Sequence, residues 1–212
     1  MSPCTRVLAA GLAVLAALLA SGVAASATGG DPKVALTSGD QAAAKEIVLR
    51  RGDLGSGWAL TKVHLGGRSI AAGSLCPGFH PDLSRLTVTG QAATRATNTV
   101  KSAVTVALVL KRRADAQAIA RELQAPFVRR CFQPGTTRND VRVDTVSRDS
   151  LAGGVRYRIG MTFVKVHKRY YADYVYLTNG RRWVSVIFSS VGLKLPESVE
   201  PRAIQALQQR LS

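Results

Sequence analysis

Histidine and cysteine are scarce in this chain of 212 residues, which contains three of each. No G-x-S-x-G window marks a nucleophile elbow, and a Ser-His-acid set could be assembled only from scattered residues. A structural zinc site needs four ligands, and the nearest pattern is Cys76 followed by His80. The glycines of residues 52–57 lack the strand-to-helix order of a nucleotide-binding loop. We therefore expect no metal, no cofactor and no common catalytic motif.

Acidic residues are also few, with 13 Asp and Glu against 29 Lys and Arg, which gives a formal net charge of +16. Such a charge favours anionic partners of any kind. One basic group, Lys165, Lys168 and Arg169, surrounds a predicted hairpin tip. Because no nucleic-acid recognition module accompanies the charge, we expect a lipid, an anionic metabolite, a wall polymer or the envelope surface as partner, and not a nucleic acid.

Only one long apolar run is present, at residues 7–20. Arg6 precedes it and the small residues 21–27 follow it, which is the order of a secretory signal peptide. The alternative is a membrane anchor, but a spanning helix needs about 20 predominantly apolar residues. We predict a signal peptide over residues 1–27, cleavage near Ala27, and a secreted chain that is extracellular or associated with the cell envelope.

Two cysteines, Cys76 and Cys131, remain after that cleavage. An even number of cysteines in an oxidising compartment predicts one disulfide between them. Zinc binding by Cys76 and His80 is the alternative, although the other histidines are isolated in the sequence.

The periodicity of the chain predicts a flexible linker at residues 28–37 and a single domain at 38–212. Helices are expected at 38–52, where Ser38 and Gln41 have capping-box spacing, at 113–131 with a kink at Pro126, and at 196–211. Strands are expected at 58–65, 85–90, 102–110, 140–147, 154–166, 169–178 and 181–190. The fold class is α+β: a mainly antiparallel sheet flanked by helices, as in an α/β/α sandwich, with one disulfide.

The Asn179-Gly180 pair is a strong hairpin signal, because both central positions of a type I′ turn need positive φ. This turn would place Tyr176 opposite Trp183 and separate two faces of the sheet. One face is aliphatic and carries Val175, Leu177, Val184, Val186 and Phe188; the other is aromatic and carries Tyr174, Tyr176, Trp183 and Ile187. A second two-residue loop at 167–168 would add Tyr157 and Ile159 to the aromatic face. Neither face is polar enough to be left in water, so we expect a cover on each.

The order of these elements and three short sequence segments match the pattern of a known family of domains. The segments are DLGSGW (53–58), GGVRYRIGMTF (153–163) and NGRRWVSVIFSS (179–190). They resemble the extracellular sensor domains of actinobacterial serine/threonine kinases of the PknH type and related secreted proteins and lipoproteins. The resemblance implies an antiparallel sheet flanked by helices, a cleft for a ligand, and no catalysis. It assigns no ligand-contacting residue, and those domains often have four cysteines where two are expected here.

The aromatic face has two interpretations, a packed core or the wall of an open cleft between sheet and helix. The preferred function is non-catalytic, sensor-like binding of an amphipathic or anionic ligand in such a cleft. The candidate residues are Tyr174, Tyr176 and Trp183 as apolar wall and Arg156, Arg158 or Arg182 as anion partners. One alternative is a structural or interaction module held to anionic envelope surfaces by charge. Another is a secreted hydrolase using two of Asp140, Asp144, Asp149 and Asp173. The sequence leaves the oligomeric state open.

Overall fold

A nine-stranded sheet forms the centre of the fold in the computed structural model, which describes residues 30–65, 81–121, 125–138, 140–195 and 198–212. The strand order is β1-β3-β4-β9-β8-β7-β6-β5, and β2 pairs with β3. Only the β1–β3 pair is parallel among these strands, so the sheet is mostly antiparallel as expected. The strands are β1 (Lys33–Val34), β2 (Ala59–Lys62), β3 (Thr87–Asn98), β4 (Lys101–Leu110), β5 (Thr137–Arg138), β6 (Val141–Leu151), β7 (Gly154–Phe163), β8 (Lys168–Asn179) and β9 (Arg182–Val191).

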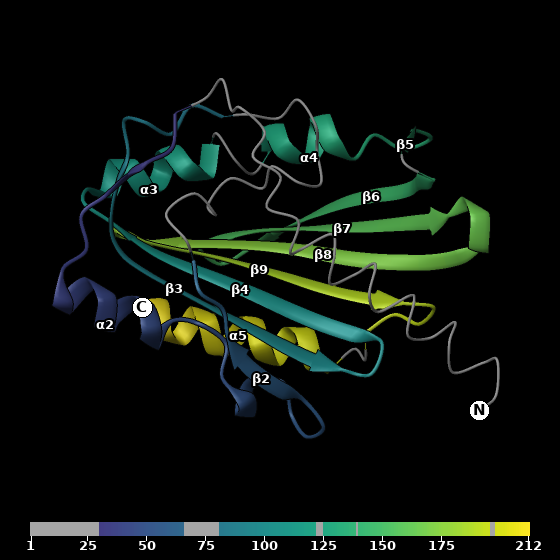
Figure 1. The fold of residues 1–212 in the computed structure, drawn as a ribbon, viewed down its shortest axis with the longest axis horizontal. Helices are drawn as coiled ribbons and strands as arrows, with labels where there is room; N and C mark the ends of the chain where they lie inside the picture. The colour runs from purple at the N-terminus through teal and green to yellow at the C-terminus, as the bar shows by residue number, and fades with distance from the viewer. Residues whose placement is uncertain (1–29, 66–80, 122–124, 139, 196–197) are drawn as a thin grey trace.

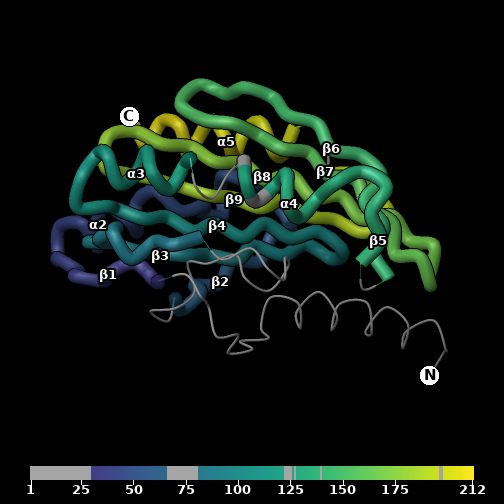
Figure 2. The backbone as a smooth tube through the Cα atoms, turned by 90° about the horizontal axis from the view of Figure 1, so that it is seen from above, coloured from purple at the N-terminus to yellow at the C-terminus, as the bar shows by residue number. Residues whose placement is uncertain are grey.

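Helices cover both faces of this sheet (Figure 1). Helices α3 (Arg113–Ile119) and α4 (Ala125–Cys131) lie above it in that view, and α2 (Ser38–Glu46) and α5 (Val199–Leu211) lie below. Figure 2, turned to look from above, shows β3, β4, β9, β8 and β7 following one another across the sheet. This arrangement confirms the mixed α+β class with helices on the two faces.

Two separate cores follow from the alternation of side chains along the strands. The first core lies between the sheet and α3 and α4, and it contains the aromatic face together with Tyr157 and Ile159. The second core lies between the sheet and α5, and it contains the aliphatic face, including Val184 and Phe188. Both predicted faces are therefore present and covered.

Both predicted hairpins have a different register from the expected one. Asn179 pairs with Arg182, so the turn consists of Gly180, with φ of +58°, and Arg181. The guanidinium of Arg181 donates to the carboxylate of Asp40 and to the carbonyl oxygen of Leu110, which holds this turn against α2 and β4. Tyr176 consequently faces Ser185 and not Trp183.

The β7–β8 turn is longer than the two residues expected. Phe163 pairs with Lys168, and the turn contains the short helix η3 (Val164–Val166) and His167 in the left-handed region. Both register errors shift the pairing by an even number of positions, which leaves every side chain on its predicted face.

The first predicted helix is shorter than expected. Helix α2 ends at Glu46 because Ile47, Val48 and Leu49 are all buried, and one face of a helix cannot bury three consecutive side chains. Its N-cap is Thr37 and not Ser38, and the Thr37 hydroxyl accepts a hydrogen bond from the backbone N–H of Asp40 at 3.3 Å. Residues 51–53 form a separate turn, η1 (Arg51–Asp53).

The second predicted helix is two helices, α3 and α4. Pro126 is the second residue of α4. A proline fits the first turn of a helix, because the N–H groups there have no partner within the helix.

Part of the expected linker is a strand. Lys33 and Val34 pair with Thr87 and Val88, and the N–H of Thr37 donates to the carbonyl oxygen of Thr89 at 2.9 Å. Backbone hydrogen bonds therefore attach this segment to the edge of β3.

Cys131 takes part in a disulfide bond. Cys76 lies outside the described residues, as does His80, so the structure describes no disulfide between two placed cysteines and the pairing of Cys76 with Cys131 stays a prediction. The expected signal peptide at 1–27 also lies outside them. Within the described ranges, no helix is both long and apolar enough to cross a bilayer.

Candidate ligand-binding site

The three aromatic candidates are core residues. Tyr174, Tyr176 and Trp183 are each at most 6% exposed. The rings of Tyr176 and Trp183 are 6.1 Å apart, and Phe132 lies 5.4 Å from Tyr174. Burial raises the pKa of both tyrosines above its usual range. These rings pack between the sheet and the α3–α4 side.

The three arginine candidates lie on the opposite face of the sheet. Arg156 and Arg158 alternate along β7 with Val155 and Tyr157, which belong to the first core, so the arginines face the α5 side. Arg156 forms ion pairs with Asp149 at 2.8 Å and Glu200 at 3.0 Å, and Arg158 pairs with Asp149 at 3.0 Å.

Arg182 belongs to that same face and donates to the backbone carbonyl of Arg210 in α5 at 3.3 Å. The structure therefore separates the six candidates into two groups, and one cleft cannot hold them all. Whether any of the six contacts a ligand stays a prediction.

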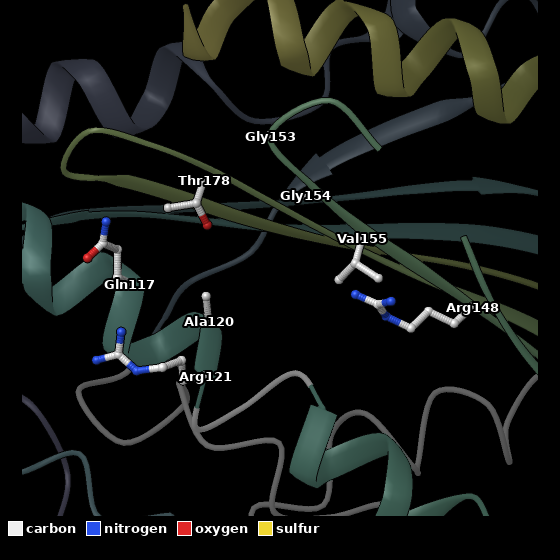
Figure 3. A pocket seen from close by; sticks show the side chains of 8 residues that line it. All are labelled: Gln117, Ala120, Arg121, Arg148, Gly153, Gly154, Val155 and Thr178. Carbon is white, nitrogen blue, oxygen red and sulfur yellow. The ribbon is translucent and has the colours of Figure 1, made fainter. Parts of the chain in front are cut away.

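An open hollow of about 530 Å³ lies between α3 and the strands, on the aromatic side of the sheet. In Figure 3, Gln117, Ala120 and Arg121 line the hollow from α3 and the turn that follows it, and Arg148, Val155 and Thr178 line it from the strands opposite. Gly153 and Gly154, at the β6–β7 turn, complete the lining. This hollow is the cleft between sheet and helix that we take as the candidate site.

The β6–β7 turn positions the strand side of the hollow. The backbone N–H of Thr178 donates to the carbonyl oxygen of Gly153 at 2.8 Å, and Gly153 has φ of +72°. A Cβ on Gly154 would lie 1.9 Å from the carbonyl oxygen of Tyr176, a separation that no side chain tolerates. Glycine at position 154 therefore allows β7 and β8 to approach closely beside the hollow.

Replacing Gly154 with alanine should lower the free energy of unfolding by about 3 kcal/mol, because the new methyl group must push backbone apart. Urea unfolding followed by circular dichroism measures the change. Gly39→Ala is the matched control, since no atom lies within 4 Å of the added Cβ and the residue lies in a helix. Gly154→Ala unfolding at the same urea concentration as Gly39→Ala would contradict this close approach.

Two arginines dominate the electrostatics of the hollow. Arg121 and Arg148 are both exposed, and neither has a hydrogen bond or ion pair within the described part of the chain. Other arginines do have acidic partners, as Arg112 has in Asp115 at 2.8 Å and Arg181 in Asp40 at 2.9 Å. Asp115 and Asp40 are thus engaged away from the hollow, and no described acid pairs with either of the two cations at it.

A further polar group lies next to the hollow. The indole N–H of Trp183 is buried and has no hydrogen-bond acceptor among the residues that the structure describes. Trp183 pairs across the strands with Thr178, which lines the hollow, and both residues lie on the same face. This donor is one strand away from the open space.

Most of the lining residues could not be predicted from the sequence. Ala120 lies within the helix predicted at 113–131, but Gln117, Arg121 and Arg148 have no distinctive pattern around them. These residues meet only because α3 packs over the β6–β7 turn, and this packing is a tertiary relationship. Within the described residues, no three His, Cys, Asp or Glu side chains are grouped so that they could hold a metal ion.

The fold and the hollow define a mixed α+β protein built on one large, mostly antiparallel sheet. No family model matches the chain, and no curated protein matches it. One similar solved structure is the extracellular domain of PknH from Mycobacterium tuberculosis, at 10% identity and a TM-score of 0.42. The match covers 58% of this chain and 64% of that domain, which is less than two thirds of it. A likeness this distant assigns neither a family nor a ligand.

Proposed function

We propose that this protein is a secreted, non-catalytic, sensor-like binding domain of the cell envelope, and that it takes an amphipathic anion into the hollow between α3 and the sheet. The observation that carries the proposal is that Arg121 and Arg148, which have no hydrogen-bond or ion-pair partner among the described residues, lie at one open hollow. Guanidinium groups bind carboxylate and phosphate through paired, charge-assisted hydrogen bonds.

The size and lining of the hollow suit a small ligand with an apolar part. Its volume of about 530 Å³ falls in the usual range for ligand pockets. Ala120 and Val155 supply apolar wall between the two arginines and the amide of Gln117. A phosphate or carboxylate head with a short alkyl chain would therefore find both charge and apolar contact.

The absence of catalysis is part of the proposal. None of the described residues that line the hollow is a histidine, cysteine, aspartate or glutamate, so these residues offer no general acid or base with the usual chemistry. The carboxyl groups of Asp173 and Glu200 lie on the other face of the sheet and line neither this hollow nor the smaller one beside Trp58.

Isothermal titration with dodecyl phosphate, below its micelle concentration, tests the binding. We expect Arg121→Gln/Arg148→Gln to weaken binding by about 100-fold, since each hydrogen bond to a charged group contributes about 1.5–3 kcal/mol. Arg51→Gln/Arg138→Gln is the matched control, because it removes two exposed charges far from the hollow. Dodecyltrimethylammonium should not bind.

An equal loss in both double variants would instead favour the alternative, a module held to anionic surfaces by its overall charge. Salt separates the two functions, because the Debye length falls from about 8 Å at physiological ionic strength to about 3 Å at 1 M. Binding in the hollow should persist in part at 1 M NaCl through its apolar contacts, whereas attachment by charge alone should vanish.

A further inference from the structure

Exposed apolar side chains gather at one end of the sheet. Val164 is 38% exposed, Val166 is 60% exposed and Leu193 is 70% exposed. The first two lie in the β7–β8 turn, and Leu193 follows β9; both segments are at the right-hand end of the sheet in Figure 1. The backbone N–H of Gly192 donates to the carbonyl oxygen of Arg169 at 2.8 Å, which fixes the two segments side by side. We call residues 164–169 and 192–194 the basic apolar end.

Cations surround these apolar side chains. Lys165, Lys168, Arg169 and Lys194 all belong to the basic apolar end and are exposed, as is His167. Lys168 and Arg169 make no ion pair with a described residue, and the Lys194 ammonium lies 5.8 Å from the centre of the Tyr171 ring.

The acids near this end do not neutralise it. Asp140 pairs with Lys165 at 2.7 Å, but both side chains are more than half exposed, so the pair is weak. Asp144 is engaged by Arg142 at 2.9 Å and by the Thr162 hydroxyl at 2.7 Å. The cations therefore outnumber the acids around the three apolar side chains.

This combination is typical of surfaces that bind anionic membranes. Water disfavours exposed apolar side chains, whereas the interface of a bilayer accepts them, and basic residues around them add attraction to anionic head groups. A small ligand could not cover a projecting turn, and a nucleic acid would use the cations but not the valines and leucine.

We propose that the basic apolar end docks the protein on an anionic lipid bilayer. Val166 and Leu193 enter the head-group region, and Lys168, Arg169 and Lys194 contact lipid phosphates. This inference goes beyond the proposed ligand binding and does not depend on the hollow, so Arg121→Gln/Arg148→Gln should dock as the unaltered protein does.

Flotation with vesicles in 0.15 M NaCl tests the docking. The protein is expressed in a host that exports it and is used in the form that the host releases. Vesicles of phosphatidylcholine with 30% phosphatidylglycerol are compared with vesicles of phosphatidylcholine alone. We expect partition into the anionic vesicles only. Lys168→Gln/Arg169→Gln should reduce it by about fivefold per charge. Val166→Ser/Leu193→Ser should reduce it by about tenfold, because it removes apolar area and keeps every charge.

Val34→Ser/Leu36→Ser is the matched control for lost apolar area. These side chains are 41% and 46% exposed. They lie near the start of β3, where β1 pairs with Val88, at the end of the sheet opposite the basic apolar end. This control should dock normally, and circular dichroism should show that all variants are folded. Equal partition into neutral and anionic vesicles would overturn the proposal. So would unchanged partition of Val166→Ser/Leu193→Ser, since docking by charge alone needs no insertion.

Discussion

Replacing Asp53 with alanine should lower the free energy of unfolding by about 3–5 kcal/mol, one of the two largest effects expected for this protein. Asp53 is buried, and its carboxylate accepts hydrogen bonds from the guanidinium of Arg210 and, at 2.7 Å, from the backbone N–H of Arg50. Arg210 also donates to the carbonyl oxygen of Val48 at 2.9 Å. The ion pair thus connects η1 with the last turn of α5, and removing the carboxylate leaves a mostly buried cation without its partner.

Urea unfolding of Asp53→Ala, Arg210→Ala and the double variant measures this connection. The double variant should lose less stability than the two single losses together, because it leaves no unpaired charge. Lys165→Ala is the matched control, and loss of its exposed pair with Asp140 should cost at most about 1 kcal/mol. A cost for Asp53→Ala as small as that of the control would show that the buried pair does not hold α5.

The two faces of the sheet were predictable because the period of a strand is two. Tyr174 and Val175 point to opposite sides whichever partners they have, so the wrong registers of both hairpins left the two cores correct. The turn positions were less predictable. The side chain of Arg181 is held by Asp40, which is 141 positions away in the sequence, and no local sequence pattern indicates this contact.

The second half of β3 could not be predicted from the periodicity of apolar residues. The strand extends to Asn98, although the sequence predicts a strand only to Gly90. Residues 91–98 contain no large apolar side chain, and the buried positions there are Ala93, Thr94 and Ala96. Small residues suffice because other segments pack closely over the strand. The Thr94 hydroxyl donates to the carbonyl oxygen of Leu49 at 3.2 Å, and just before this stretch a Cβ on Gly90 would lie 2.1 Å from the backbone oxygen of Asp40 in α2.

The sequence predicted a cleft between sheet and helix, and an open hollow lies between α3 and the strands. Ligand binding there stays a prediction, as does the role of the six candidate residues. The arginines expected at it, Arg156 and Arg158, alternate with buried Val155 and Tyr157, so the same period of two puts them on the other face. The alternation of side chains along the strand could be read from the sequence, whereas the presence of Arg121 and Arg148 at one hollow depends on how α3 packs.

On that other face, the partly buried Asp173 and the buried Glu200 give the second large prediction. Burial raises the pKa of Asp173 to about 8, and the hydrogen bond and repulsion from Glu200 add to the effect. Arg158 and Arg156 oppose it, with the Arg158 guanidinium 4.0 Å from the Asp173 carboxyl group. Asp149, also nearby, is occupied by its ion pairs with both arginines.

The folded protein therefore keeps a proton on Asp173 at pH values where the unfolded chain, with its usual pKa of 3.8, has released it. The contribution of this group to stability is full below about pH 4 and is lost progressively as the pH rises towards 8. The steepest loss is about 1.4 kcal/mol per pH unit, the value for one proton.

Asp173→Asn should remove this loss, because an amide cannot ionise and can still donate to Glu200. The difference in unfolding free energy between the variant and the unaltered protein should be small near pH 4 and should grow in favour of the variant up to about pH 8. Urea unfolding at each pH unit measures it, and Asp140→Asn corrects for the loss of one exposed carboxyl. A difference that is constant from pH 4 to pH 8 would mean that Asp173 ionises in the folded protein as it does in the unfolded chain. The pair would then be two carboxylates held by Arg156 and Arg158, and the contact of α5 with β7 and β8 would not respond to pH in this range.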